Sequence, residues 1–371
     1  MAELLSVSTI LPRYCVRASE TCSAIRAALP RNIAERFVRM VEMSQNQTRY
    51  SVLPFEEIKA LKTLDVRNIQ YSEHAVRLGT VAADEALRTA NVQPNEIGAV
   101  IGVSSTGHLM PTLETHVIDR LHLSANSRRV PLTQLGCAGG VASLGLARVL
   151  SEVESESKVL IVSVELPSLS FPTVEPSPTD ILASAQFGDG AAAAVMSRRR
   201  EGRGPGVIDS GSALFPGTIN DDGVRSTGVG LRQSRPRRLA ETLRRRLGDV
   251  VDEFLSRHRL RRADVGFWAI HPRNPQLLAA AATSLGLAES ALAASRAVWR
   301  RAGNVISAAV FHVLQEFSVA SPREAGELGM AIAYGAGFGC EMVLLQAGGW
   351  LCSRPVEATA AGEAVADGPR T

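Results

Sequence analysis

Three side chains in this sequence, Cys137, His271 and Asn304, could together perform acyl transfer through a thioester. Cys137 follows Gly136, which permits a sharp backbone turn, and precedes a run of small residues with helical periodicity. This position predicts that the sulfur lies at the start of a helix, where the helix dipole lowers the thiol pKa from about 8.5 toward neutrality. Because the thiolate is the nucleophilic form of cysteine, we expect Cys137 to carry an acyl group.

The other two side chains are suited to stabilise an oxyanion. His271 ends the apolar stretch 265–270, and Asn304 opens a predicted helix. An imidazole and an amide can both hold the oxygen of an enolate or a tetrahedral intermediate. Each residue also has a purely structural interpretation, as a small buried cysteine, a histidine capping a strand and an asparagine at a helix N-cap. The combination of the three types favours the catalytic interpretation.

The composition is typical of a globular enzyme and argues against several other classes. The chain has 371 residues, of which 45% are hydrophobic, and a formal net charge of +3. Its five cysteines form no CxxC pair, and the N-terminus lacks a secretion signal, so we expect a reducing cytosol and no metal site. The basic stretch 232–262 carries leucines at helical spacing, which predicts a solvated helix and no nucleic-acid partner. The apolar stretch 328–347 predicts two buried strands and no membrane span.

The elements that must position the three side chains alternate between helices and strands. Helices are predicted over 76–90, 138–153, within 232–262, 276–285 and 304–317, and strands over 97–103, 159–164, 191–196, 265–270, 329–333 and 340–345. The first 70 residues show only short helical patterns, and the tail 350–371 is predicted to be disordered. This alternation favours an α/β fold with helices on a mixed or parallel sheet.

Two pairs of similar segments suggest an internal duplication. Gly136-Cys137 and Gly303-Asn304 each open a helix of small residues, and 187–190 and 334–337 each introduce an apolar strand. The two pairs occur in the same order. We therefore expect two similar halves, residues 1–205 with the cysteine and residues 206–349 with the histidine and the asparagine, followed by the tail 350–371.

Four passages carry a family resemblance: 134–141 (QLGCAGGV), 187–193 (FGDGAAA), 267–272 (FWAIHP) and 303–308 (GNVISA). With them, residues 30–347 resemble the type III polyketide synthases, the chalcone-synthase-like branch of the thiolase superfamily. The resemblance implies a five-layered αβαβα fold, a homodimer, and the substrates acyl-CoA and malonyl-CoA. It implies that Cys137 takes the acyl group while His271 and Asn304 stabilise the enolate left by malonyl decarboxylation. Chain extension and cyclisation would follow, and no cofactor is required.

The resemblance also assigns binding residues. Phe187 matches an aromatic residue that borders the CoA tunnel, Met110 matches a methionine that reaches into the partner's cavity, and Arg36 and Arg39 match positions that meet the CoA phosphates. On the helix that carries them, the two arginines could equally form a solvated face. The remaining residues expected to line the pocket are Ser105, Thr106, Pro167, Ser170, Leu231 and Ile306.

The sequence departs from the family pattern at several positions near the site. The usual His-Pro-Gly-Gly-Pro is 271–275, HPRNP, which places Arg273 near the expected CoA entrance. Leu231 replaces an aromatic residue, Ile306 replaces a small polar one, and the usual Gly-Phe-Gly-Pro-Gly is 333–337, AYGAG. Because the three catalytic positions are unchanged, these departures put the substrate and the cyclisation mode in question. Leu231 and other small aliphatic residues in the pocket favour an aliphatic or small acyl starter and a pyrone, resorcinol or phloroglucinol type product.

Three alternatives remain open from the sequence. A ketoacyl-synthase III type enzyme or a stand-alone acyltransferase would share the same three side chains and extend the chain once or not at all. A papain-like hydrolase has the same Cys–His–Asn order but needs a Cys-Gly-Ser-Cys-Trp surround, which is missing. A non-catalytic binding protein on the same fold would carry a cysteine of ordinary reactivity.

Overall fold

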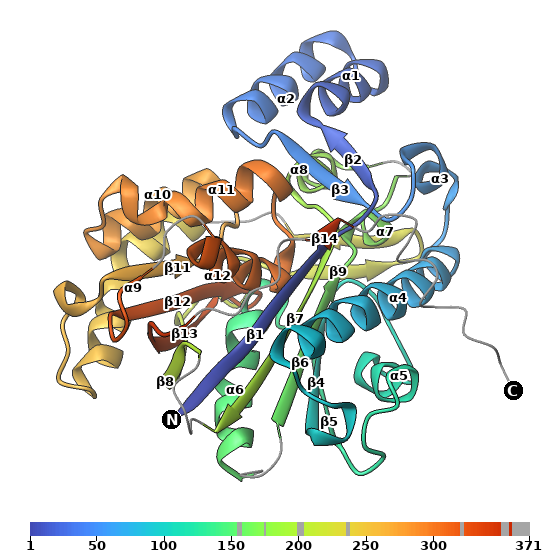
Figure 1. Cartoon of the computed structure of the whole chain (residues 1–371). Helices are drawn as coiled ribbons and strands as arrows, with labels where there is room; N and C mark the ends of the chain where they lie inside the picture. Colours follow the sequence, from blue (N-terminus) through green and yellow to red (C-terminus); the bar gives the residue numbers. More distant parts are fainter. Residues whose placement is uncertain are drawn as a thin grey trace, which may run out of the picture.

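The computed structural model of the chain describes residues 1–153, 158–173, 176–198, 204–234, 238–319, 323–349 and 356–357. Its main feature is a ten-stranded mixed sheet (Figure 1). The strands of this sheet are β1 (Ala2–Leu11), β4 (Ile97–Ser104), β5 (Arg128–Thr133), β6 (Lys158–Glu165), β7 (Gly190–Arg198), β8 (Gly206–Leu214), β11 (Phe267–Ile270), β12 (Leu328–Gly335), β13 (Gly339–Gln346) and β14 (Val356–Glu357). Two small hairpins pair β2 (Tyr14–Arg17) with β3 (Thr48–Ser51) and β9 (Val224–Thr227) with β10 (Gly230–Gln233).

The strands fall into two sets that meet at the start of β1. The order is β11-β12-β13-β8-β1-β7-β6-β4-β5, and β14 pairs with the other end of β1. Strands β4, β5 and β6 run parallel, as do β11 and β12, and the remaining pairs on the path are antiparallel. Strand β1 contacts β8 only through Ala2 and Glu3. The two sets therefore diverge from this junction and leave room for helices between them.

Helices fill the space between the two sets and cover both outer faces. The helices are α1 (Ala18–Ala28), α2 (Arg31–Met43), α3 (Phe55–Ala60), α4 (Leu64–Ala90), α5 (Leu113–Arg120), α6 (Gly139–Val153), α7 (Pro167–Ser170), α8 (Pro178–Gln186), α9 (Leu239–Ser256), α10 (Pro275–Leu285), α11 (Ala293–Ala302) and α12 (Ala309–Val319). Helices α6 and α12 share one core with strands of both sets. Helix α4 packs on the outer face of the β1-β7-β6-β4 set, and α9 and α10 pack on the outer face of the other. These five layers confirm the predicted αβαβα fold (Figure 1).

Strand β7 shows why the central strands have continuous apolar sequences. Its alternate residues Ala191, Ala193 and Val195 belong to the core under α4, whereas Ala192, Ala194 and Met196 belong to the core around α6 and α12. Successive side chains of a strand point to opposite faces. Because helices cover both faces, every position from Ala191 to Met196 is apolar and the usual alternation with polar residues disappears there.

Two central strands were missed by the sequence patterns. The sequence predicts only short helical patterns in the first 70 residues, but Ala2–Leu11 forms the strand β1. It predicts no strand at Gly206–Leu214, which forms β8. Strand β1 mixes apolar residues with buried polar ones, which hides its pattern. Those polar side chains find partners inside the protein, since Ser6 Oγ donates to Ala86 O (2.7 Å) and Thr9 Oγ1 donates to Gln315 Oε1 (2.5 Å).

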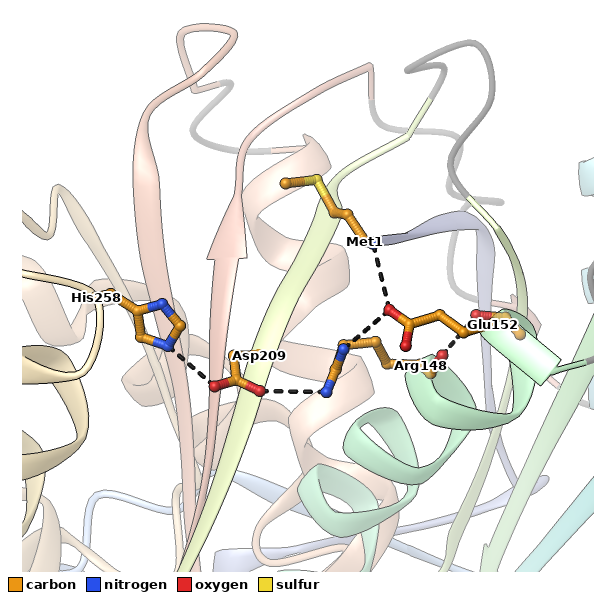
Figure 2. A network of polar contacts seen from close by, with 6 residues as sticks. Met1, Arg148, Glu152, Asp209 and His258 are labelled. Atoms are coloured by element: carbon orange, nitrogen blue, oxygen red, sulfur yellow. Dashed lines mark hydrogen bonds and ion pairs between the residues drawn. The ribbon is translucent and has the colours of Figure 1, made fainter.

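A chain of polar contacts links the two halves near the N-terminus (Figure 2). Asp209 of β8 contacts His258 Nε2 (3.0 Å) and Arg148 Nη2 (3.2 Å). Arg148 of α6 also contacts Glu152 (3.0 Å), which accepts from the amino group of Met1 (3.3 Å). Such partly exposed pairs contribute about 0–1 kcal/mol each. The shared core around α6 and α12 therefore holds the halves together more strongly than this network does.

The predicted disordered tail, residues 350–371, lies outside the described residues apart from Val356 and Glu357, which form β14. Among the helices that the structure describes, none combines the length and the hydropathy that crossing a bilayer requires.

Candidate active site

Cys137 lies in a short 3₁₀ turn, Gly136–Ala138, between β5 and α6. Gly136 adopts a φ of +56°, a conformation that glycine accepts without strain, and its N–H donates to Ser105 Oγ (2.9 Å). The turn places Cys137 directly before the buried helix α6, and only 6% of the residue is exposed. The prediction that Cys137 lies at the start of a helix is therefore confirmed. The residue lies in the 3₁₀ turn that leads directly into α6.

Asn304 occupies the equivalent place before the other central helix. It is fully buried, and a second 3₁₀ turn, Ile306–Ala308, separates it from α12. Its backbone N–H donates to Gln186 O (2.9 Å), and its Oδ1 accepts from the N–H of Ile306 (2.9 Å). The amide nitrogen Nδ2 lies 3.7 Å from Cys137 Sγ. Asn304 thus combines a local capping role with a donor that faces the sulfur.

A close backbone approach brings these two segments together. A Cβ atom at Gly140, in the first turn of α6, would lie 2.1 Å from the carbonyl oxygen of Ser307 in the facing turn. Only glycine fits at this position. The run of glycines after Cys137 therefore lets the beginnings of the two central helices meet, and the sulfur and the carboxamide meet with them.

His271 follows directly after β11, and its N–H donates to Ile332 O (2.8 Å). The side chain is fully buried, and neither ring nitrogen has a hydrogen-bond partner among the described residues. Burial, reinforced by the charge of Arg273, lowers the pKa of His271 to about 3. The imidazole is therefore neutral at physiological pH and keeps one N–H to donate.

The thiol of Cys137 differs from the sequence-based expectation. Burial raises the pKa of Cys137 to about 11, and the nearby carboxylates of Asp222 and Glu165 act in the same direction. Arg273 and the hydrogen bond to Asn304 oppose this rise. The direction is opposite to the lowering expected from the sequence, and its largest cause is the removal of the thiol from water.

A buried carboxyl group behind the nucleophile was not identified from the sequence. Glu165, the last residue of β6, is fully buried and accepts from the N–H of Ser105 (3.0 Å), from Thr106 Oγ1 (2.8 Å) and from the hydroxyl of Ser307. Burial raises the pKa of Glu165 to about 7 in spite of these bonds. A carboxyl at the end of an otherwise apolar strand is the signal that could have found it.

We expect Glu165→Gln to change how stability depends on pH. The pKa of Glu165 rises on folding from 4.5 to about 7, so its protonated form stabilises the fold below pH 4.5 and that contribution is lost as pH rises to about 7. Glutamine cannot ionise. Relative to the wild type, the variant should therefore gain roughly 3 kcal/mol in free energy of unfolding between pH 4.5 and 8. Urea unfolding at both pH values measures this, and a difference that does not vary with pH would contradict it.

A groove of about 1030 Å³ opens between residues of α2, α8, α9 and the start of α10. Arg36 of α2, Phe187 and Arg273 all line it, whereas Arg39 is exposed on α2 and is not among the residues that line the groove. The backbone of Phe187 forms a β-bridge with Asn304, and its ring stacks on Phe171 at 5.3 Å. The groove therefore runs beside Phe187, a residue whose backbone is bridged to Asn304.

Arg273 was expected near the CoA entrance as a cation that binds the substrate. It lines the groove, but its side chain is only 8% exposed and forms two bonds with the buried carboxylate of Asp222. Much of its hydrogen-bonding capacity is therefore already used inside the protein. Asp222 itself was not singled out from the sequence, since the pair Asp221-Asp222 in a polar loop carries no distinguishing pattern.

The residues predicted to line the pocket lie on four separate segments of the chain. Ser105 and Thr106 follow β4, Pro167 and Ser170 form α7, Leu231 lies on β10, and Ile306 lies two residues after Asn304. A Cβ at Gly230 would lie 2.6 Å from Ser170 O, so β10 packs against α7 next to Leu231.

Two of these side chains have hydroxyls that are already engaged. Thr106 Oγ1 donates to Glu165 and accepts from Leu166 N (2.9 Å), and Ser170 Oγ bonds to Leu166 O (3.0 Å) and to Thr106 O. They can shape a pocket without offering a free polar group. Ile306 is a branched residue with a φ of +48°, a strained conformation of the kind that concentrates at functional sites.

Met110 differs from the other predicted residues because it is 96% exposed. It lies on the loop that begins at Ser105, and Ser105 is hydrogen-bonded to Gly136 beside the nucleophile. Met110 is therefore a solvent-exposed side chain and is not among the described residues that line the groove.

The Phe-Gly-Asp-Gly passage has a structural role. Asp189 is fully buried, and its carboxylate accepts from Val52 N (2.9 Å) and from Ser168 N (2.9 Å) and Oγ (2.5 Å). Burial raises the pKa of Asp189 to about 6. This carboxylate ties the segment after β3 to α7 and so fixes the wall that carries Phe187.

Comparisons with known proteins show which family the sequence matches. Residues 1–199 match the family model for the N-terminal domain of chalcone and stilbene synthases, and residues 210–348 match that for the C-terminal domain. The chain is 32% identical to 1,3,6,8-tetrahydroxynaphthalene synthase of Streptomyces peucetius subsp. caesius over 304 residues, covering 81% of this chain and 80% of the relative. It is 29% identical to phloroglucinol synthase of Pseudomonas fluorescens over 313 residues, covering 82% and 87%.

Solved structures give the same result. The crystal structure of 1,3,6,8-tetrahydroxynaphthalene synthase from Streptomyces coelicolor A3(2) superposes with a TM-score of 0.88 at 28% identity, covering 93% of this chain and 99% of the other. The similarity thus extends over nearly the whole length of both chains.

Proposed function

Since the chain belongs to the chalcone and stilbene synthase family and is a type III polyketide synthase, an acyltransferase, we propose that it extends a small aliphatic acyl-CoA starter with malonyl-CoA on Cys137. The observation that carries this assignment is the convergence of Cys137 and Asn304 from two different halves, with the amide nitrogen 3.7 Å from the sulfur.

The first step loads the starter. The thiolate of Cys137 attacks the thioester carbonyl of the acyl-CoA, a bond from sulfur to the acyl carbon forms, and the CoA thiolate leaves. The raised pKa of Cys137 means that the free protein holds mostly the thiol, so loading should become faster as pH rises.

The second step forms the carbon nucleophile. The thioester oxygen of malonyl-CoA accepts hydrogen bonds from the imidazole N–H of His271 and the amide of Asn304. The bond to the carboxylate breaks, carbon dioxide leaves, and its electron pair forms the enolate whose oxygen those donors hold. A neutral histidine is suited to this role, because it donates a hydrogen bond without giving up a proton.

The third step joins the two units. The enolate carbon attacks the thioester on Cys137, the sulfur leaves as thiolate, and the product is a CoA thioester two carbons longer. Return of that product to the sulfur repeats the cycle, and cyclisation ends it. Decarboxylation supplies the carbanion and CoA supplies the leaving group, so the proposal requires neither a metal nor a redox cofactor.

The groove lined by Arg36 and Phe187 is the proposed path of CoA, with Arg36 and Arg39 meeting its phosphates. Guanidinium groups are suited to this because they bind phosphate through paired hydrogen bonds. Arg36 supports the proposal more strongly than Arg39, since it lines the groove.

We also propose that the protein works as a homodimer in the cytosol. Met110 is 96% exposed on a loop anchored beside the nucleophile, which suits a side chain that completes the cavity of a second copy. A reducing compartment would keep the catalytic thiol free of disulfides.

Incubating the purified protein with malonyl-CoA and a panel of short aliphatic and aromatic acyl-CoA starters tests the substrate assignment. We expect two or more extensions on the aliphatic starters and a pyrone, resorcinol or phloroglucinol product by mass spectrometry. Only one extension would favour a ketoacyl-synthase III type reaction, and acyl exchange without extension would favour a stand-alone acyltransferase. Exclusive use of aromatic starters would contradict the expected pocket.

A further inference from the structure

The small hairpin that carries Leu231 lies apart from the main sheet. Strands β9 and β10 form a separate two-stranded sheet. The turn between them is fixed from two sides, because Gly228 O accepts from Leu64 N (2.9 Å) and the backbone of Gly230 packs closely against Ser170 O. The first residue of β10 therefore has a defined position, and the contacts of the following residues hold the rest of the strand.

Arg232, the residue after Leu231, fastens β10 to helix α8. Its Nη1 donates to Asp180 Oδ2 (2.7 Å), and the two side chains are 24% and 0% exposed. The same carboxylate oxygen accepts from the N–H and the hydroxyl of Ser177 (both 2.8 Å), the residue that caps α8. A buried carboxylate needs such partners. Because the cap fixes Asp180, the ion pair holds the strand to the helix.

A second arginine in the hairpin makes the carboxylate of Asp180 important. Arg232 lies directly opposite Arg225 of β9 in the register of the two strands. Like charges that lie opposite each other across a strand pair destabilise it. The negative charge of Asp180 offsets this repulsion on the side of the hairpin that contacts α8. The position of β10 therefore depends on the ion pair.

Strand β10 and helix α8 line the same groove. Gln233 of β10 lines it together with the side of α8 and its C-terminal end, residues Thr179, Leu182, Ala183, Gln186 and Phe187. Side chains two positions apart in a strand share a face, so Leu231 and Gln233 point to the same side of β10. The distance between β10 and α8 thus sets the width of the groove beside Leu231.

Helix α8 is also tied to the active site, which restrains it more than β10. Gln186 O accepts from Asn304 N (2.9 Å), and the backbone of Phe187 is bridged to Asn304. The ring of Phe187 stacks on Phe171 at 5.3 Å. Because α8 has these backbone and ring contacts while a side-chain ion pair joins β10 to it, loss of the pair should move β10 and leave α8 in place.

We propose that the ion pair between Arg232 and Asp180 sets the distance between β10 and α8 and thereby determines which lengths of acyl chain the enzyme accepts. This inference rests on the proposed function, because it takes Leu231 and the groove as parts of the acyl-CoA site. Arg232 and Asp180 are positioning residues, which act through the strand that carries Leu231. With the pair intact the groove stays narrow, and short starters are favoured.

The experiment compares the second-order rate constants with which octanoyl-CoA and butanoyl-CoA acylate Cys137, measured by intact-protein mass spectrometry. The ratio of two rates on one preparation does not depend on how much of it is folded. For Arg232→Met, which removes the charge and keeps an unbranched side chain, we expect the octanoyl to butanoyl ratio to rise about tenfold, the size of effect that one methylene has in a hydrophobic pocket. Asp180→Asn, which keeps an oxygen for the cap, should raise it equally.

Three further variants separate positioning from a general loss of stability. Arg232→Lys keeps the positive charge and should keep the ratio of the wild type. The double variant of Arg232→Met and Asp180→Asn should raise the ratio no further than either single variant, because each removes the same interaction. Arg148→Met is the matched control, since it breaks the partly exposed pair with Asp209, neither residue of which lines the groove (Figure 2). It should leave the ratio unchanged.

Three results would overturn the proposal: an unchanged ratio in Arg232→Met, an equal rise in Arg148→Met, or effects that add in the double variant. Failure of the proposed function would appear separately, as acylated Cys137 that gives no extended product with malonyl-CoA. The ratio of acylation rates does not depend on extension, so it still tests the role of the ion pair in that case.

Discussion

Replacing Cys137 with alanine should abolish polyketide formation, lowering the rate by roughly 10⁴-fold or more, as expected when a covalent nucleophile is removed. No acyl-enzyme can form without the sulfur. His271 and Asn304 remain in place, however, so malonyl-CoA should still lose carbon dioxide. Intact-protein mass spectrometry after incubation with an acyl-CoA measures loading, and acetyl-CoA formation from malonyl-CoA measures decarboxylation.

The exposed Cys15 offers a matched control. Cys15→Ala removes a thiol far from the site in sequence and should leave loading and product formation unchanged. If Cys137→Ala kept full product formation, the assignment of the nucleophile would be wrong. If it lost decarboxylation together with loading, the two steps would share the sulfur, and the separate role given to His271 and Asn304 would fail.

Asn304→Ala should have the second-largest effect, and mainly on decarboxylation. Removing one donor to a developing oxyanion costs about 10²–10³-fold in rate. Loading of Cys137 should change much less, because the nucleophile and the groove remain. Carbon dioxide release from malonyl-CoA and acyl-enzyme formation, measured on the same preparation, separate the two steps.

A second substitution separates the chemical role of Asn304 from its structural one. Asn304 Oδ1 accepts from the N–H of Ile306 (2.9 Å), and its Nδ2 faces Cys137. Asn304→Asp keeps an oxygen that can accept from Ile306 and removes the amide donor. We expect it to retain more thermal stability than Asn304→Ala and to lose decarboxylation to a similar extent. Decarboxylation at the wild-type rate in Asn304→Asp would show that no amide donor is needed.

The sequence predicted the parts of the fold that have regular patterns. Strands β4, β6, β7, β12 and β13 and the helices α6 and α10 were placed to within a few residues, because continuous apolar runs and helical periodicity are local signals. Strands β1 and β8 were missed. Buried serine and threonine break the apolar run of β1, and their partners Ala86 and Gln315 lie far away in the sequence.

At the site, residue types were more predictable than energetics. Gly136, Cys137 and Asn304 stand out through their spacing and their glycines, and the structure brings Cys137 and Asn304 within 3.7 Å. The pKa of the thiol could not be predicted, because it depends on how deeply the sulfur is buried and on which charges face it. The pairing of Arg273 with Asp222, 51 residues apart, is likewise a property of the tertiary structure.

The position of β1 has a consequence for how the chain folds during synthesis. This strand is synthesised before its antiparallel partners in the sheet, β7 and β8, which begin at Gly190 and Gly206. Contacts between such distant segments form slowly, because a long loop must close first. Ala2–Leu11 therefore stays unpaired until Gly190–Arg198 has also been synthesised. An unpaired strand of this kind is a template for aggregation. Slow translation or scarce chaperones should reduce the yield of this protein through the unpaired strand Ala2–Leu11.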